Sequence, residues 1–225
     1  MKQSTIMTVI LSSLFPIMIL AGCATPPSTP AEFAGTPPAI VQTEPRIVTF
    51  PDENLAAAIR ESLGKPVDEE ILFTELAQLT ESKAWDAGIT DLSGIEYCTN
   101  LSVLGFWRNP ISDVSPVSSL TNLTILCLQG NDVSGTSPLA SLTNLIDLHL
   151  TQNQVSDISP LLANSGLGEG DSVLLGGNGL DLSQGSEDME NIRVLESRGV
   201  LVSLDPQQWA PENASPGTPV PVPIE

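Results

Sequence analysis

The sequence predicts an α/β solenoid: a short right-handed arc of stacked coils, with parallel strands on its concave face. Apolar residues recur every 22 positions, an asparagine keeps one place in each repeat, and helix-like segments flank the repeats. The recurring apolar residues are Leu101, Leu123 and Leu145, then Leu104, Leu126 and Leu148, then Phe106, Leu128 and Leu150. A period of this length is typical of coils that each contain one strand and one return segment.

The repeats follow the frame L-x-x-L-x-L-x-x-N-x-I/V-S, which is a leucine-rich repeat and extends over about residues 81–185. A short strand in each coil points its leucines inward and its intervening residues outward. One coil cannot shield its own leucines from water, so the stack is the unit that folds. Asn178 follows Asn153 by 25 positions, which predicts three inserted residues, most simply in "SGLGEG".

The asparagines of the frame are expected to form a ladder inside the stack. Their amides can satisfy backbone N–H and C=O groups that a buried turn leaves without partners. The ladder residues are Asn109, Asn131, Asn153 and Asn178.

Capping segments are predicted at both ends, because an open stack would expose its leucines. In residues 47–80, Asp52 can cap a helix that ends at Gly64, and "EEILFTELAQL" predicts a second short helix. In residues 186–204, Ser186 can cap a helix that stops at Gly199. A last strand is expected at 200–204.

The N-terminal residues predict export and a lipid anchor. Residues 1–22 combine Lys2 with an apolar stretch that Pro16 and polar residues interrupt, the layout of a secretory signal. They end in "LAGC", which resembles a bacterial lipobox. The resemblance implies cleavage before Cys23, lipid on its sulfur and acylation of its amine, palmitate included. The body is then expected outside the cytoplasm, held to the cell membrane or the outer membrane.

Two Pro-rich segments flank the folded body. Residues 23–46 predict an extended tether, and residues 205–225 predict a disordered tail. The chain of 225 residues has 8 Lys and Arg against 27 Asp and Glu, a net charge of −19. This charge argues against nucleic acid and against docking on anionic lipid, and it favours basic partners.

The 22-residue period, the "TNL" phrasing and the "GIEYCTNL" entry resemble the internalin-like leucine-rich repeat proteins of bacterial surfaces. The resemblance covers about residues 48–204. It implies a non-catalytic, monomeric module that binds a protein or a glycan on its concave face, without cofactor or metal. A structural envelope spacer or assembly protein without a discrete ligand is the alternative.

The outward positions of the strands supply the candidate binding residues. Trp85 and Trp107 fall at the same outward position of adjacent coils and predict a contact patch, unless the caps or the N-terminal segment cover one of them. Of the two, Trp85 is the one expected to be covered in that case. The full set of candidates is Trp85, Trp107, Gln129, Thr151, Cys127, His149 and Asp147.

The sequence also leaves open a catalytic cysteine and a calcium site. Cys127 and His149 on adjacent coils could form a nucleophile and its base, although no oxyanion hole or deep pocket accompanies them. Acidic residues at the bends, Asp91, Asp113 and Asp157, could attract calcium, but isolated carboxylates at least 22 positions apart are more often solvated. Cys98 takes an inward position and Cys127 an outward one, so no disulfide is expected between them.

Overall fold

The computed structural model describes residues 46–205. The signal-like segment, Cys23, the tether and the C-terminal tail are therefore outside the described residues, and the predictions made for them stay predictions. Within the described part, no helix combines the length and apolar character needed to cross a bilayer.

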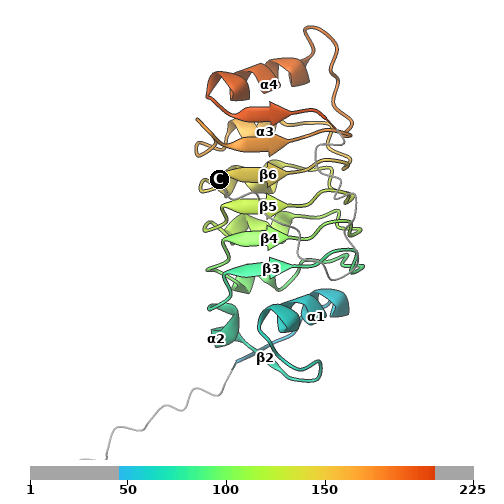
Figure 1. The fold of residues 1–225 in the computed structure, drawn as a ribbon, viewed down its shortest axis with the longest axis vertical. Coiled ribbons are helices and arrows are strands. Elements are labelled where there is room, and N and C mark those ends of the chain that lie inside the picture. Colours follow the sequence, from blue (N-terminus) through green and yellow to red (C-terminus); the bar gives the residue numbers. More distant parts are fainter. Residues whose placement is uncertain (1–45, 206–225) are drawn as a thin grey trace, which may run out of the picture. The chain divides into compact units, whose positions relative to one another are not determined.

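A parallel sheet of six strands runs through the described residues, in the order of the chain (Figure 1). Its strands are β3 (Glu81–Lys83), β4 (Val103–Gly105), β5 (Ile125–Cys127), β6 (Asp147–His149), β7 (Ser172–Leu174) and β8 (Leu201–Ser203). Val103 pairs with Ile125 and Ile125 with Asp147, so the register advances by the predicted 22 residues. Asp147 pairs with Ser172, which confirms the insertion of three residues.

One-turn helices return the chain between the strands. They are η1 (Ile95–Tyr97), η2 (Ser115–Ser119), η3 (Ser137–Ser141) and α3 (Ser159–Leu162), each in contact with the next. Pro116, Pro138 and Pro160 are the second residues of three of them, in the first turn, where the absent N–H costs no hydrogen bond. The sheet and this row of helices form two layers.

The core lies between the two layers. The inward strand residues Leu104, Leu126 and Leu148 are fully buried, as are Phe106 and Leu128, each two residues further along its coil. Burying a leucine side chain is worth roughly 1.5–3 kcal/mol. Stacking therefore stabilises each coil through its neighbours, and the predicted leucine-rich repeat fold with a parallel sheet is confirmed.

The N-terminal part holds helix α1 (Glu53–Ser62) and helix α2 (Phe73–Leu76). Asp52 caps α1, as predicted, and α1 lies against β3. The sequence did not predict the antiparallel pair β1 (Ile47–Val48) and β2 (Ile71–Leu72). Two-residue strands are too short to show the alternation that identifies a strand. Strand β2 also takes the start of the segment expected as helix, so α2 is a single turn.

Helix α4 (Glu187–Ser197) packs against α3 and β8 at the other end of the sheet (Figure 1). Ser186 caps it through a hydrogen bond from the Met189 N–H, and Gly199 follows it with φ of 92°. A side chain at Gly199 would come within 2.8 Å of the Glu169 Cα. Glycine therefore allows the end of this helix to lie against the inserted segment between β6 and β7.

Candidate functional site

Four asparagine amides bind the buried turns of successive coils. At Asn131, Oδ1 accepts the Ile111 N–H of the preceding coil at 3.2 Å. Its Nδ2 donates to the carbonyls of Phe106, in the preceding coil, and Leu128, in its own, each at 2.8 Å. Asn109, Asn153 and Asn178 repeat this pattern. Because each amide joins two coils, the turns fix the spacing of the strands and of the side chains on the outer face.

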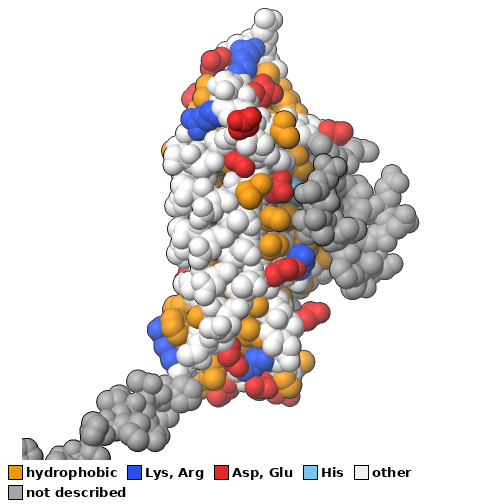
Figure 2. Space-filling view, turned by 60° about the vertical axis from the view of Figure 1, so that its left-hand side comes forward, with side chains coloured by type: hydrophobic (Ala, Val, Ile, Leu, Met, Phe, Trp, Pro, Cys, Tyr) orange, Lys and Arg blue, Asp and Glu red, His pale blue; other side chains and the backbone are white. Residues whose placement is uncertain are grey.

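The outward face of the sheet is far less exposed than the sequence suggests. Gln129 is 7% exposed and Thr151 2% exposed, and Cys127, His149 and Leu174 are also buried. Val103, Ile125 and Asp147, the paired first residues of β4, β5 and β6, keep intermediate exposure. Figure 2 shows a vertical band of hydrophobic side chains along the coils. Two apolar residues keep large exposed areas: Ile146, which directly precedes β6, and Leu201, the first residue of β8.

The two tryptophans are held in different ways. The Trp107 ring lies over Gly105, where a side chain of any other residue would overlap it. The Trp85 ring is half-buried and carries the Arg108 guanidinium 5.8 Å from its centroid, a cation–π geometry. Trp107 is 9% exposed and is therefore the more buried of the two rings. In the sequence, the glycine at 105, two positions before the tryptophan and on the same face of the coil, was the available signal that the Trp107 ring folds over the backbone.

Gln129 and Thr151 lie side by side on adjacent coils, because the Gly130 N–H donates to the Thr151 carbonyl at 2.9 Å. The Gln129 Oε1 and the Thr151 Oγ1 are buried and have no hydrogen-bond partner. An unbonded buried polar atom costs about 1–3 kcal/mol. The pair therefore marks a place where a hydrogen-bonding group from elsewhere would stabilise the protein.

The structure brings Cys127 and His149 together, with Sγ 3.5 Å from Nδ1. Burial raises the pKa of the Cys127 thiol to about 12, and the charge of Asp147 adds to the rise. Burial also lowers the pKa of His149, although Asp147 opposes the shift. Both shifts favour the neutral thiol and the neutral imidazole, whereas a cysteine nucleophile needs the thiolate. The pair is suited to packing rather than to nucleophilic chemistry.

The described residues contain no cluster of three or more metal-binding side chains. Each acidic bend residue instead accepts the N–H of a serine two positions later. Asp113 Oδ1 takes the Ser115 N–H at 2.8 Å, and Asp157 Oδ1 takes the Ser159 N–H at 2.8 Å. Hydrogen bonds from the serine hydroxyl and, next, from the serine N–H lower the pKa of both carboxyl groups. The D-x-S spacing thus starts the return helices of the coils.

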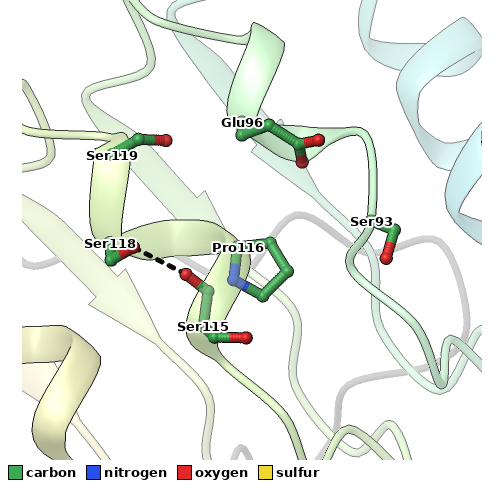
Figure 3. Close-up of a pocket in the computed structure, with 6 residues that line it drawn as sticks. All are labelled: Ser93, Glu96, Ser115, Pro116, Ser118 and Ser119. Carbon is green, nitrogen blue, oxygen red and sulfur yellow. Dashed lines mark hydrogen bonds between the residues drawn. The ribbon is translucent and has the colours of Figure 1, made fainter.

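A hollow of about 270 Å³ lies on the helix side, between η1 and η2 (Figure 3). Its polar groups are engaged within their own turns. The Ser118 hydroxyl donates to the Ser115 carbonyl at 2.7 Å, and Glu96 accepts the Gly94 N–H at 2.7 Å. Figure 3 shows no convergence of these side chains on one point. The hollow therefore offers no arrangement of groups for binding or catalysis.

Sequence reasoning missed a second asparagine ladder on the exposed side of the coils. Asn100, Asn122 and Asn144 each donate to a carbonyl of the preceding coil, at 2.6, 2.9 and 2.7 Å. The repeated "TN" before each leucine was its signal. A partly buried contact between the hydroxyls of Ser62 in α1 and Ser82 in β3, at 3.0 Å, was also missed. Ser82 occupies the inward position that leucine takes in the next three strands.

Comparison with known proteins finds two copies of the family described as Leucine Rich repeats, over residues 121–163. No curated protein sequence matches the chain. Among solved structures, an internalin (inlF) from Listeria monocytogenes is similar at 30% identity and a TM-score of 0.56, over 63% of this chain and 49% of that one. The functional domain of InlJ from the same organism matches at 27% identity and a TM-score of 0.49, over 60% and 29%.

The chain spans about half the length of that first internalin. It contains leucine-rich repeats, and its fold is structurally similar to internalins of Listeria.

Proposed function

We propose that this leucine-rich repeat chain, with its structural similarity to Listeria internalins, is a non-catalytic module that binds a protein on a concave sheet face and is held at the cell envelope by lipid on Cys23. The observation that carries the proposal is the pair Trp85 and Trp107, fixed on neighbouring coils of one sheet face. The Asp86 N–H donates to the Trp107 carbonyl at 3.0 Å, which places the two segments side by side.

The two rings are positioned before any ligand arrives. Arg108 stacks on Trp85, and the bare backbone of Gly105 seats Trp107. A side chain that is already ordered loses little conformational entropy on binding, and tryptophan is the residue type most enriched among dominant contacts in protein interfaces. The buried asparagine ladder keeps the coils rigid beneath them. This supports a preformed recognition surface at β3 and β4.

Charge supports a partner with basic residues. The chain has a net charge of −19. Near the tryptophans, Glu81 forms an ion pair with Lys83, and Asp147 lies further along the same edge of the sheet. A negative field of this size raises the rate at which basic partners meet the surface, and the effect weakens with added salt.

Ligand capture tests the face. The soluble Cys23→Ala chain would be immobilised and the envelope proteins that it retains would be quantified. Trp85→Ala and Trp107→Ala are each expected to weaken capture about tenfold or more, because removing an anchoring tryptophan typically costs 2 kcal/mol or more. Gly105→Ala keeps both tryptophans but displaces the Trp107 ring. We expect it to weaken capture as well, with the melting temperature of each variant measured alongside.

The matched control is Val67→Ala, which removes a strongly exposed apolar side chain away from the sheet. It is expected to capture as the unaltered chain does. If all three face variants retain the same proteins with unchanged affinity, the face is not a binding site and the structural-spacer interpretation is favoured.

Cys23 tests the anchor. Several acyl chains hold a protein stably at a bilayer, whereas none remain if the acceptor cysteine is absent. Cys23→Ala is expected to move the protein from the membrane fraction to the soluble fraction and to abolish incorporation of labelled palmitate. Cys98→Ala, in the core, serves as the control for loss of a cysteine elsewhere. Retention of the label in the Cys23→Ala protein would contradict lipid attachment at this residue.

A further inference from the structure

The outward side chains at β5, β6 and β7 are more buried than the repeat alone explains. On an open sheet, outward side chains of this size keep much of their surface in water. Here Gln129, His149 and Leu174 are all buried. Among residues 46–205, the helices with substantial contacts to the sheet meet its end strands, α1 at β3 and α4 at β8. The middle of the face is therefore buried without a described helix packed on it.

The same region contains the two unbonded polar atoms, Gln129 Oε1 and Thr151 Oγ1. A carbonyl oxygen needs a donor, and a hydroxyl can take either role. The backbone of an extended peptide supplies N–H and C=O groups at regular intervals, so a peptide crossing the coils can serve both atoms. The occupant that fits this surface is an extended polypeptide.

We propose that this peptide is the chain's own segment 206–225, which lies outside the described structure, and that its first residues cross β7, β6 and β5 with Trp209 over the face. The segment follows Asp205, two residues beyond the end of β8. Strands are about 4.8 Å apart, so β5 is about 14 Å from β8. At roughly 3.1–3.3 Å per residue, an extended chain covers this distance in about five residues. Trp209 is the fourth residue after Asp205.

The composition of the segment also matches the surface that it would cover. The segment 206–211 reads Pro-Gln-Gln-Trp-Ala-Pro and has no charge. The buried outward side chains that it would cover are also uncharged, with Gln129, Thr151, Cys127 and Leu174 among them, and the carboxylate of Asp147 lies beside them on β6. Prolines restrict the unbound chain to extended conformations and reduce the entropy lost on docking. Because the segment is tethered, its effective concentration is in the millimolar range, and a weak contact is sufficient.

A peptide on β7, β6 and β5 does not cover the tryptophan pair at β3 and β4, which stays accessible to an external ligand. The inference is thus independent of ligand capture by Trp85 and Trp107. It differs from the expectation that residues 205–225 are disordered along their whole length, because it places the first residues of that segment on the sheet.

Alkylation of Cys127 tests the proposal in the full chain carrying Cys23→Ala. Cys127 lies under the proposed path, and Cys98 in the core is an internal reference. Iodoacetamide at pH 8.5 with peptide mass spectrometry gives the two rates separately. Trp209→Ala is expected to raise the Cys127 rate at least tenfold and to leave Cys98 unreactive. Ile224→Ala, in the same segment but beyond the needed reach, should leave both rates unchanged.

A chain that ends at Asp205 gives the second measurement, with its circular dichroism compared with that of the full chain. Its Cys127 should react as fast as in Trp209→Ala, and a synthetic peptide of residues 206–225 at millimolar concentration should slow the reaction again. The proposal is overturned if Trp209→Ala leaves the Cys127 rate unchanged. It is also overturned if protection in the full chain rises with protein concentration, since a second copy would then be the occupant.

Discussion

Asn131→Ala is expected to lower the free energy of unfolding by about 3–4 kcal/mol, because several buried backbone groups lose their partners together. The Ile111 N–H and the carbonyls of Phe106 and Leu128 are bonded to the Asn131 amide. The alanine leaves them buried, and each buried unsatisfied group costs about 1–3 kcal/mol, with less than full additivity. For a folded body of this size, the melting temperature should fall by about 10 °C.

Asn122→Ala is the matched control for this change. The two residues are nine positions apart in the same coil, and both amides donate to a carbonyl of the preceding coil. Asn122 is exposed, so water replaces its hydrogen bond to the Thr99 carbonyl. We expect a loss of about 1 kcal/mol or less in urea unfolding. Equal losses for the two variants would show that the buried ladder contributes no more than a surface hydrogen bond.

The repeat was predictable because its physics is local and periodic. Leu104, Leu126 and Leu148 must all face one core, so their spacing gives the strand register directly. The ends of α1 and α4 were predictable for a similar reason. A side chain such as Asp52 or Ser186 caps only the N–H groups within its next three residues, and the pattern is visible in a short stretch of sequence.

The parts of the candidate site that the sequence did not predict depend on contacts between coils or between side chains. The period places Trp107 in an outward row but does not say that its ring lies over Gly105. It places Gln129 and Thr151 side by side but says nothing of their burial or their unbonded atoms. Side-chain direction on a sheet follows from periodicity, whereas exposure depends on what else covers the face.

Asp52 combines both kinds of contact. Its Oδ1 accepts the N–H groups of Asn54 and Leu55, which is the cap predicted from sequence. Its Oδ2 accepts the Thr90 N–H at 2.7 Å, the Thr90 hydroxyl at 2.9 Å and the Asp91 N–H at 3.1 Å. These partners are 38 and 39 residues away in the chain, so no local sequence pattern predicts these hydrogen bonds. One carboxylate therefore ties the start of α1 to the first bend of the repeats.

Asp52→Ala is accordingly expected to lower the free energy of unfolding by about 3 kcal/mol near pH 6, through the lost cap and the unpaired groups at Thr90 and Asp91. Asp52→Ser separates the two roles, because its hydroxyl can cap α1 but cannot also reach the bend. We expect it to recover about 1 kcal/mol, the usual worth of an N-cap. Urea unfolding followed by circular dichroism measures both. A serine variant as stable as the unaltered chain would show that the bond to the bend contributes nothing.

The effect of Asp52 should also depend on pH, in a direction set by its pKa. Burial alone would raise the pKa of this carboxyl, but hydrogen bonds from Thr90, Leu55 and Asp91 outweigh burial and lower it from 3.8 to about 2. A carboxyl whose pKa is lower in the folded state stabilises the protein above its unfolded pKa, and this contribution disappears as the pH falls through the folded value. The shift corresponds to about 2 kcal/mol.

The stability difference between the unaltered chain and Asp52→Ala should therefore shrink by about that amount between pH 5 and pH 2. Asp113 and Asp157, whose pKa values are also lowered, are present in both proteins, so their contributions cancel in the difference. A difference that stays constant over this range would mean that Asp52 is not held as a carboxylate by the bend.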